Sequence, residues 1–305
     1  TRIVAVELAP DEGEVIAHID LAALTANNVT YAVHGGAPLH YWNFFPASDP
    51  EWGVVPVWGY AEVAESRHPD IAVGARFFGY WPSATHLKLR PGPLKAGGFA
   101  DMAPHRQGLA PVYNNYRPAG GSPPELDRLT ALFQPLYGTG FVLGHALRAD
   151  ADAGRHIIIT SASSKTALAT AWNLAQAGHP AIGLTSARNK AFAEITGYYR
   201  VVLSYEELAE LDAGAPSVLV DFSGNGALLT ALHAHLTGLA ASHVVGDTNW
   251  SAAPPTALAG PQPQLFFAPT HWEERARAIG PAAFEAELAE SLNAFVQTTG
   301  NWLTL

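Results

Sequence analysis

The sequence has 305 residues, a formal net charge of -10 at neutral pH, 48% hydrophobic residues, 14% charged residues and no cysteine. This length suits two domains or one large α/β unit, and the high hydrophobic content excludes a disordered chain. The acidic excess argues against nucleic acid or an anionic membrane as the main partner. The missing cysteine excludes disulfides, cysteine-ligated zinc, iron–sulfur clusters and a thiol nucleophile. No signal peptide or membrane span is visible, so we expect a cytoplasmic protein.

The first third of the chain is rich in predicted strands. "DEGE", with Gly13 inside it, is typical of a hairpin between the first two apolar runs. The strand-like runs, which are broken by Gly and Pro, cover 1–9, 14–24, 52–66, 70–81 and 85–91. Many short strands with turn residues between them predict a barrel or sandwich-like domain.

From Pro124 onward the pattern changes to helices that alternate with strands. Apolar residues at helical spacing predict a first helix, which Pro135 should kink or divide. Predicted strands follow at 156–160, 180–186, 199–204 and 217–222, and predicted helices at 164–177, 188–196, 205–211 and 226–236. Residues 265–272 are predicted to end a strand, and 280–300 to form an amphipathic helix. Strands that are apolar on both faces and separated by helices predict a parallel sheet.

The turn after the strand 157–159 has the position of a nucleotide-binding turn but no glycine. In such turns glycines allow close approach to a pyrophosphate, and the helix that follows supplies free N–H groups. Here hydroxyl groups would donate to phosphate instead, from Thr160, Ser161, Ser163, Ser164 and Thr166. Lys165 would lie in the first helical turn, where a cation costs roughly 0.3–1 kcal/mol unless an anion is bound. The alternatives are a Ser-rich helix cap beside an exposed lysine, or a P-loop that lacks both of its glycines.

The end of the next strand supports a phosphate site. A site for NAD carries an acidic residue there, which binds the ribose hydroxyls. This chain has donors in its place, namely Thr185, Ser186, Arg188, Asn189 and Lys190. Because Arg can bind a 2′-phosphate through two N–H groups, the pattern predicts NADP(H) rather than NAD(H). The alternative is a solvated start of a helix.

Residues 156–208, "HIIITSASSKTALATAWNLAQAGHPAIGLTSARNKAFAEITGYYRVVLSYEEL", resemble the nucleotide-binding domain of the medium-chain dehydrogenases/reductases. "VLVDFSGNGALLTAL" resembles the next strand and helix of that family. "GEVIAHIDLAALTANNVTYAVHG" and "DIAVGARFFGYW" resemble parts of its first domain. Without cysteine and without a Gly-His-Glu motif, the chain is similar to the zinc-free branch, which includes quinone and enoyl reductases. The match is nearest to a subfamily with Ser-Ala-Ser-Ser-Lys-Thr in the turn.

The resemblance implies an α/β fold with two domains and a homodimer. It implies a β-rich GroES-like domain, a partly open barrel, over 1–123 and a Rossmann-like NADP-binding domain over 124–270. It also implies that a helix and strand in 271–305 return to the first domain. The family usually adds a further helix and a final strand, so we expect that this chain is short or that its tail is missing.

The activity implied by the resemblance is a zinc-independent, NADP(H)-dependent reduction of a small apolar carbonyl, enone or quinone, with no metal site. Tyr31 and Asn28 occupy a segment that borders the substrate pocket in the family, and Asn115 and Tyr116 a segment that meets the nicotinamide. Tyr31, Asn28 and Tyr116 are therefore the catalytic candidates. In the alternative interpretation, Asn28 satisfies turn backbone and Tyr31 is core. Two other functions stay open, an NADP(H)-binding protein with a lyase-like or sensor role and a degenerate fold that acts as an interaction module.

Overall fold

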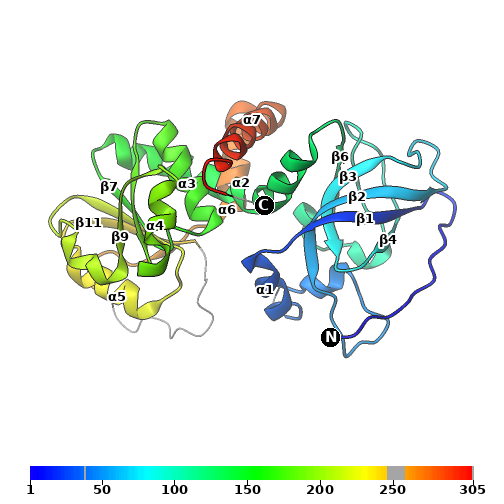
Figure 1. Ribbon diagram of the computed structural model, residues 1–305, viewed down its shortest axis with the longest axis horizontal. Coiled ribbons are helices and arrows are strands. Elements are labelled where there is room, and N and C mark those ends of the chain that lie inside the picture. The colour runs from blue at the N-terminus through cyan, green and yellow to red at the C-terminus, as the bar shows by residue number, and fades with distance from the viewer. Residues whose placement is uncertain (38, 246–257, 304–305) are drawn as a thin grey trace. The chain divides into compact units, whose positions relative to one another are not determined.

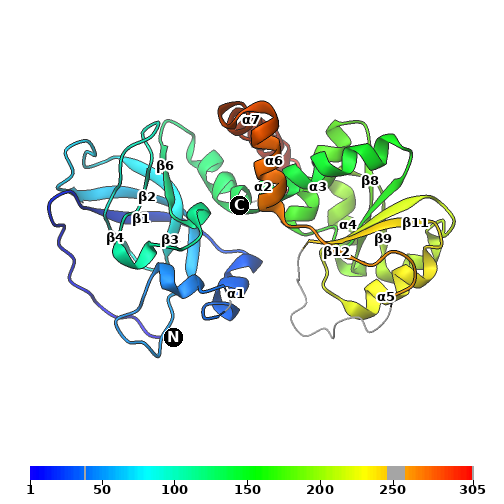
Figure 2. The ribbon, with the colours of Figure 1, turned by 180° about the vertical axis from the view of Figure 1, so that it is seen from behind.

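The computed structural model describes residues 1–305 except 38, 246–257 and 304–305. It contains two compact units, Thr1–Pro135 and Leu136–Leu305. The first holds a six-stranded antiparallel sheet and the second a six-stranded parallel sheet (Figures 1 and 2). This confirms the predicted fold class, a Rossmann-like sheet domain together with a β-rich domain. No helix in the described part of the chain has both the length and the apolar character needed to span a bilayer.

The sheet of the first unit has the strand order β4-β1-β2-β3-β6-β5. Its strands are β1 (Val15–Ala23), β2 (Pro56–Ser66), β3 (Arg76–Pro82), β4 (His86–Leu89), β5 (Phe99–Ala100) and β6 (Asn115–Ala119). The short helices α1 (Ala26–Val33), η1 (Tyr41–Phe44), η2 (Pro104–Arg106) and η3 (Pro111–Tyr113) lie between them in the chain. Large aromatic side chains fill the core of this unit, and Trp81, Tyr80 and Tyr116 are fully buried.

The hairpin predicted at Gly13 is absent from the structure. Gly13 does adopt the left-handed turn conformation, with φ +80°, but residues 1–9 form no strand and Ile3 is 99% exposed. The reason lies in the sheet, because β1 pairs with β2 on one side and with β4 on the other. Residues 1–9 therefore have no free edge of β1 to join, whatever their strand propensity.

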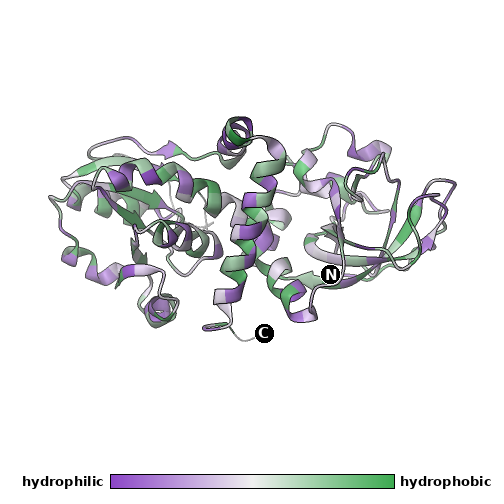
Figure 3. Cartoon of the chain, turned by 90° about the horizontal axis from the view of Figure 1, so that it is seen from above, coloured by the Kyte–Doolittle hydropathy of each residue, from purple (hydrophilic) through white to green (hydrophobic). Residues whose placement is uncertain are grey.

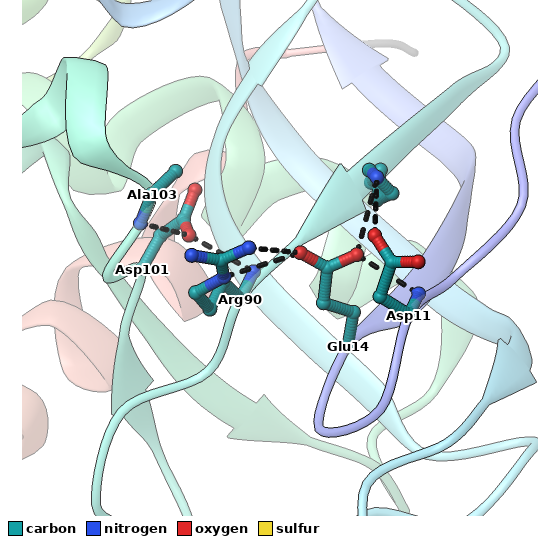
Figure 4. A network of polar contacts seen from close by, with 6 residues as sticks. Asp11, Glu14, Arg90, Asp101 and Ala103 are labelled. Atoms are coloured by element: carbon teal, nitrogen blue, oxygen red, sulfur yellow. Dashed lines mark hydrogen bonds and ion pairs between the residues drawn. The ribbon is translucent and has the colours of Figure 1, made fainter.

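A polar network fixes the start of β1 to the end of β4 (Figure 4). One carboxylate oxygen of Glu14 accepts from Nε and Nη2 of Arg90 at 3.1 and 2.9 Å. The other accepts from the backbone N–H of Asp11 at 3.0 Å and lies 3.1 Å from Nζ of Lys88. Burial alone would raise the pKa of the Glu14 carboxyl, but these donors lower it to about 2. Glu14 therefore stays ionised although its side chain is buried.

The sheet of the second unit has the order β12-β11-β10-β7-β8-β9. Its strands are β7 (His156–Ile159), β8 (Ala181–Thr185), β9 (Tyr199–Ser204), β10 (Ser217–Asp221), β11 (Leu239–Val244) and β12 (Gln264–Leu265). The intervening helices are α3 (Lys165–Gln176), α4 (Ala187–Ile195), the 3-10 helix η4 (Tyr205–Glu210) and α5 (Gly226–His235). Leucines of η4 and α5 pack on the central strands, whose apolar residues Figure 3 shows in green.

Three helices complete the fold, and one of them lies where a strand end was predicted. Helix α2 (Pro124–Asp152) continues through Pro135, which does not divide it. Residues 268–272, predicted as a strand end, instead begin α6 (Ala268–Ile279). Helix α7 (Pro281–Thr299) is amphipathic as predicted, with Phe284 and Phe295 buried.

The boundary between the two compact units falls at Pro135, within α2, and α6 and α7 belong to the second unit. On α2, Tyr137 lies 5.1 Å from the ring of Phe295, and its hydroxyl lies 2.6 Å from Oγ of Ser291. Gly138 leaves room for Trp272, because an added Cβ would lie 2.3 Å from that ring.

Candidate functional site

The turn between β7 and α3 is built from small residues, at positions where nucleotide-binding turns usually have glycine. Ser161 takes a left-handed conformation with φ +48°, which non-glycine residues adopt infrequently. Ser164 is the N-cap of α3, and its hydroxyl accepts from the N–H of Ala167 at 3.4 Å. The turn lies close to β8, because a Cβ added to Gly183 would be 2.9 Å from Cβ of Ala162.

The hydroxyl of Thr160 is committed to the protein itself. It donates to the carboxylate of Asp221 at 2.5 Å and accepts from the N–H of Phe222 at 2.9 Å. Asp221 also accepts from the hydroxyl of Ser223 at 2.7 Å, so it organises the turn after β10. Thr160 and Asp221 are both buried, and their bond joins the carboxyl ends of neighbouring strands. Thr160 thus has a structural role, and no hydroxyl proton is left for a phosphate.

The structure brings together the two segments that the sequence singled out. The hydroxyl of Ser163 lies 3.3 Å from that of Thr185, at the end of β8. It also accepts from the side-chain amide of Asn189 on α4, at 3.1 Å. The turn after β7 and the start of α4 therefore form one polar surface at the carboxyl end of the parallel sheet, where open α/β sheets bind ligands.

The cations on this surface differ in their surroundings. Lys165 is half-buried, and burial lowers the pKa of its ammonium group. Arg188 is exposed. Within the described residues, neither of these side chains forms an ion pair. Lys190, in contrast, forms an ion pair with Glu207, in which Nζ of Lys190 lies 2.9 and 2.6 Å from the two carboxylate oxygens.

Two of the predicted hydroxyl groups at this surface have no hydrogen-bond partner among the described residues. The side chains of Thr166 and Ser186 make no hydrogen bond within the described part of the chain, and Ser186 leaves the start of α4 without a side-chain cap.

One contact at this surface was not predicted from the sequence. The hydroxyl of Tyr205, the first residue after β9, accepts from the N–H of Ser161 at 3.1 Å. Its position directly after a parallel strand was the signal that could have identified it, because the ends of such strands share one edge.

In the first unit, Tyr31 lies in a cluster of aromatic side chains. Its hydroxyl oxygen accepts from Nδ2 of Asn27 at 3.2 Å and from Nε1 of Trp58 at 3.0 Å. Because both neighbours donate, the phenolic hydrogen of Tyr31 is left for another acceptor. Burial raises the pKa of Tyr31 despite the bond from Trp58, so the phenol keeps its proton. The ring of Tyr80 lies 5.2 Å away, and the buried Tyr80 hydroxyl has no hydrogen-bond partner within the described residues.

The other candidates of the first unit have bonds that give them structural roles. Asn28 caps α1 by accepting from the N–H of Thr25 at 2.6 Å, and it donates to the carbonyl of Pro56 at 2.8 Å. The hydroxyl of Tyr116 is fully buried and donates to the carbonyl of Tyr80 at 3.0 Å. Asn115 is exposed, and its amide donates to the carbonyl of Pro111 at 2.7 Å.

A family model described as "Protein of unknown function (DUF2855)" matches residues 22–305. The chain belongs to this family. No curated protein matches the sequence.

The structure of CurA from Vibrio vulnificus in complex with NADPH is similar, with a TM-score of 0.62 and 13% identity over 96% of this chain and 88% of that one. A putative NADPH:quinone reductase from Mesorhizobium loti has a TM-score of 0.61 and 13% identity, over 98% and 80% of the two chains. A quinone oxidoreductase from Pseudomonas syringae has a TM-score of 0.56 and 16% identity, over 99% and 85%. At these identities the likeness shows a shared fold. It is the fold that the resemblance to medium-chain dehydrogenases/reductases implied, while the zinc-free branch and the site residues stay predictions.

Proposed function

We propose that the protein is an NADP(H)-dependent oxidoreductase that reduces a small apolar carbonyl, enone or quinone without zinc. The observation that carries the proposal is Lys165, a half-buried ammonium group with no ion pair in the described chain. A cation in the first turn of a helix opposes the helix dipole, and burial adds a desolvation cost. A bound anion would remove both costs. CurA, which shares the fold, was crystallised with NADPH.

The residues of the turn fit the pyrophosphate of a dinucleotide. The first N–H groups of a helix have no partner within the helix, and those of Lys165 and Thr166 have no acceptor among the described residues. The hydroxyls of Ser163, Ser164 and Thr166 and the Lys165 ammonium would add donors and charge. The N–H of Ser161 is the exception, because Tyr205 holds it, so the dinucleotide would bind on the α3 side of the turn.

The end of β8 would determine the choice of NADP(H) over NAD(H). Arg188 is exposed and unpaired in the described structure, and Ser186 has a free hydroxyl. Asn189 is bonded to Ser163, so it would link the pyrophosphate turn to this end of the site. A guanidinium group binds phosphate through two N–H groups, which makes Arg188 the residue proposed to hold the 2′-phosphate.

In the first unit, we assign the donor hydroxyl to Tyr31. When bound, NADPH supplies a hydride, and reduction of a carbonyl or quinone needs a proton at the oxygen as well. Asn27 and Trp58 hold the oxygen of Tyr31 while its hydrogen is left to donate to a substrate. The aromatic side chains around Tyr31 suit a small apolar substrate. A homodimer, implied by the family resemblance, belongs to this proposal.

A titration of tryptophan fluorescence with NADPH and NADH tests binding, and loss of NADPH absorbance with enones, quinones and aldehydes tests turnover. We expect tighter binding of NADPH than of NADH, and oxidation with at least one class of acceptor. Tight binding without oxidation would instead support the lyase-like or sensor role. Absence of binding to either nucleotide would support a degenerate fold. Sedimentation of the purified chain tests the dimer.

A further inference from the structure

Two histidines face each other across neighbouring strands of the first unit. His18 on β1 pairs directly with His86 on β4 in the antiparallel register. Their ring centroids lie 4.9 Å apart, with 50° between the ring planes. Direct cross-strand neighbours have Cβ atoms about 4.5–5.5 Å apart, which keeps two imidazoles within reach of one shared ion.

The pair lies on the face of the sheet that is turned away from the core. Ala17 of β1 belongs to a hydrophobic core cluster, and Ile19 of β1 and Leu87 of β4 are partly buried and pack against it. Side chains alternate between the two faces of a strand, so His18 and His86 point to the opposite face, and both are exposed. An ion in solution can therefore reach both rings.

The separation of the rings matches the geometry of a metal with two imidazole ligands. A zinc–nitrogen bond is about 2.0–2.1 Å long, which puts each ring centre roughly 3.2 Å from the metal. Two ring centres 4.9 Å apart then subtend about 100° at the metal. This angle lies between the tetrahedral value and the right angle of square-planar coordination, the arrangements preferred by Zn²⁺ and by Cu²⁺ or Ni²⁺.

The surroundings of the pair support the same assignment. Nδ1 of His86 lies 3.0 Å from the hydroxyl of Thr85, a contact of the kind that orients metal-bound imidazoles and leaves Nε2 as the ligand. On the other side of β1, Glu62 of β2 pairs directly with His18, is exposed and has no ion pair within the described residues. Asp20 is bound to Arg76 at 2.8 Å and is not available.

We propose that His18 and His86 bind one divalent transition-metal ion, of the class of Zn²⁺, Ni²⁺ or Cu²⁺. No group of three His, Cys, Asp or Glu side chains in the described chain is placed to hold a metal. The site therefore has two protein ligands, with water or a reoriented Glu62 in the remaining positions. Because β4 is an edge strand, the ion would join it to β1 and stabilise the sheet against fraying. This inference does not depend on the proposed reductase activity.

The test is calorimetric titration of the chelator-treated protein with ZnCl₂, on the wild type and on His18→Asn and His86→Asn. The matched control is His40→Asn, because His40 is exposed and has φ 54°, a conformation that Asn tolerates well. We expect one Zn²⁺ per chain for the wild type and the control, and at least tenfold weaker binding for each of the other variants. Circular dichroism of the metal-free variants shows whether they fold.

Two further readouts separate a shared site from unrelated binding to other histidines. Saturating Zn²⁺ should raise the melting temperature of the wild type and of His40→Asn, but not that of His86→Asn. One equivalent of Cu²⁺ should give an electron paramagnetic resonance spectrum with two nitrogen ligands, reduced to one in either variant. Wild-type zinc affinity in both folded variants, or no zinc binding by the wild type, overturns the proposal.

Discussion

Lys190 and Glu207 form a two-point ion pair, in which Nζ lies 2.9 and 2.6 Å from the two carboxylate oxygens. The same carboxylate accepts from the N–H of Ser204 at 2.7 Å, which completes the capping box of η4. Lys190 is therefore neutralised by a carboxylate that is itself held in place. Of the two cations that follow β8, Arg188 is the one left to bind a ligand.

Replacing Arg188 with Ala should weaken the binding of NADPH by tenfold or more and leave the binding of NADH nearly unchanged. A charge-assisted contact to phosphate is worth about 1.5–3 kcal/mol, and only NADPH carries the 2′-phosphate. Titration of the intrinsic tryptophan fluorescence gives both dissociation constants. Lys190→Gln is the control. It should change the preference for NADPH over NADH little, because Glu207 already neutralises the charge of Lys190. Equal affinity of the wild type for both nucleotides would contradict this role of Arg188.

Replacing Lys165 with Met should weaken NADPH and NADH by similar factors, of about tenfold or more, because the pyrophosphate is common to both. In the absence of nucleotide, the variant should be as stable as the wild type or more stable, since a desolvated cation at a helix start is removed. Binding titrations and urea denaturation measure the two effects. Lys95→Met, at an exposed lysine of the first unit, is the control for loss of charge. A selective loss of NADPH would assign Lys165 to the 2′-phosphate instead.

Local patterns in the sequence were enough for four of the six strands of the parallel sheet, but not for β11, and they placed two segments of the candidate site at one edge of the sheet. The four predicted strands of that sheet lie within one or two residues of β7, β8, β9 and β10, because strands buried on both faces give continuous apolar runs. The contact of Ser163 with Thr185 follows from the rule that neighbouring parallel strands end at one edge.

Long-range pairing explains what the sequence did not reveal. The bond of Thr160 to Asp221 spans 61 residues, and nothing near Thr160 indicates that its hydroxyl is already used. The run 1–9 has strand propensity, but both edges of β1 are occupied. Of the two outcomes predicted for Pro135, the division of the helix is wrong, because α2 continues through Pro135 and is packed by its neighbours.

Phenylalanine substitutions should separate the two tyrosines predicted to be catalytic. Tyr31→Phe should lower the rate of NADPH oxidation by about 10²-fold or more with little change in nucleotide affinity, if its hydroxyl donates the proton. Tyr116→Phe should leave turnover unchanged but destabilise the fold by about 1 kcal/mol, because the buried carbonyl of Tyr80 loses its donor. Steady-state kinetics and urea denaturation of both variants test this. The reverse pattern of effects would exchange the two roles.

Glu14→Gln should destabilise the fold at neutral pH by about 1–3 kcal/mol, because Arg90 and Lys88 lose their shared carboxylate. The pKa of Glu14 is lowered from 4.5 to about 2 in the folded state. The contribution of Glu14 to the free energy of unfolding is therefore complete above pH 4.5 and is lost as the pH falls towards 2. Urea denaturation at pH 7 and near pH 3 should show a smaller difference between variant and wild type at the lower pH. A difference independent of pH would point to packing rather than charge.

His145 should make the second unit less stable as the pH falls from 6.5 towards 4. Burial, and then the charge of Arg148, lower the pKa of this imidazole to about 4. The carboxylate of Glu287 lies 3.5 Å from Nε2 of His145 and raises the pKa, but it offsets the lowering only partly because it also binds Arg275 at 2.8 Å. The unfolded chain therefore takes up a proton in this pH range that the folded chain does not, so the free energy of unfolding falls with falling pH. The full shift corresponds to at most about 3 kcal/mol.

His145→Gln should flatten this part of the pH profile while keeping the side chain neutral and similar in size. The measurement is urea denaturation at intervals between pH 7 and pH 4, with His40→Asn as an exposed histidine that should leave the slope unchanged. Because the stabilisation by Glu14 is lost only below pH 4.5, the effects of Glu14 and His145 fall mostly in separate pH ranges and can be measured in one series. An unchanged slope between pH 6.5 and pH 4.5 in His145→Gln would show that other groups control acid unfolding.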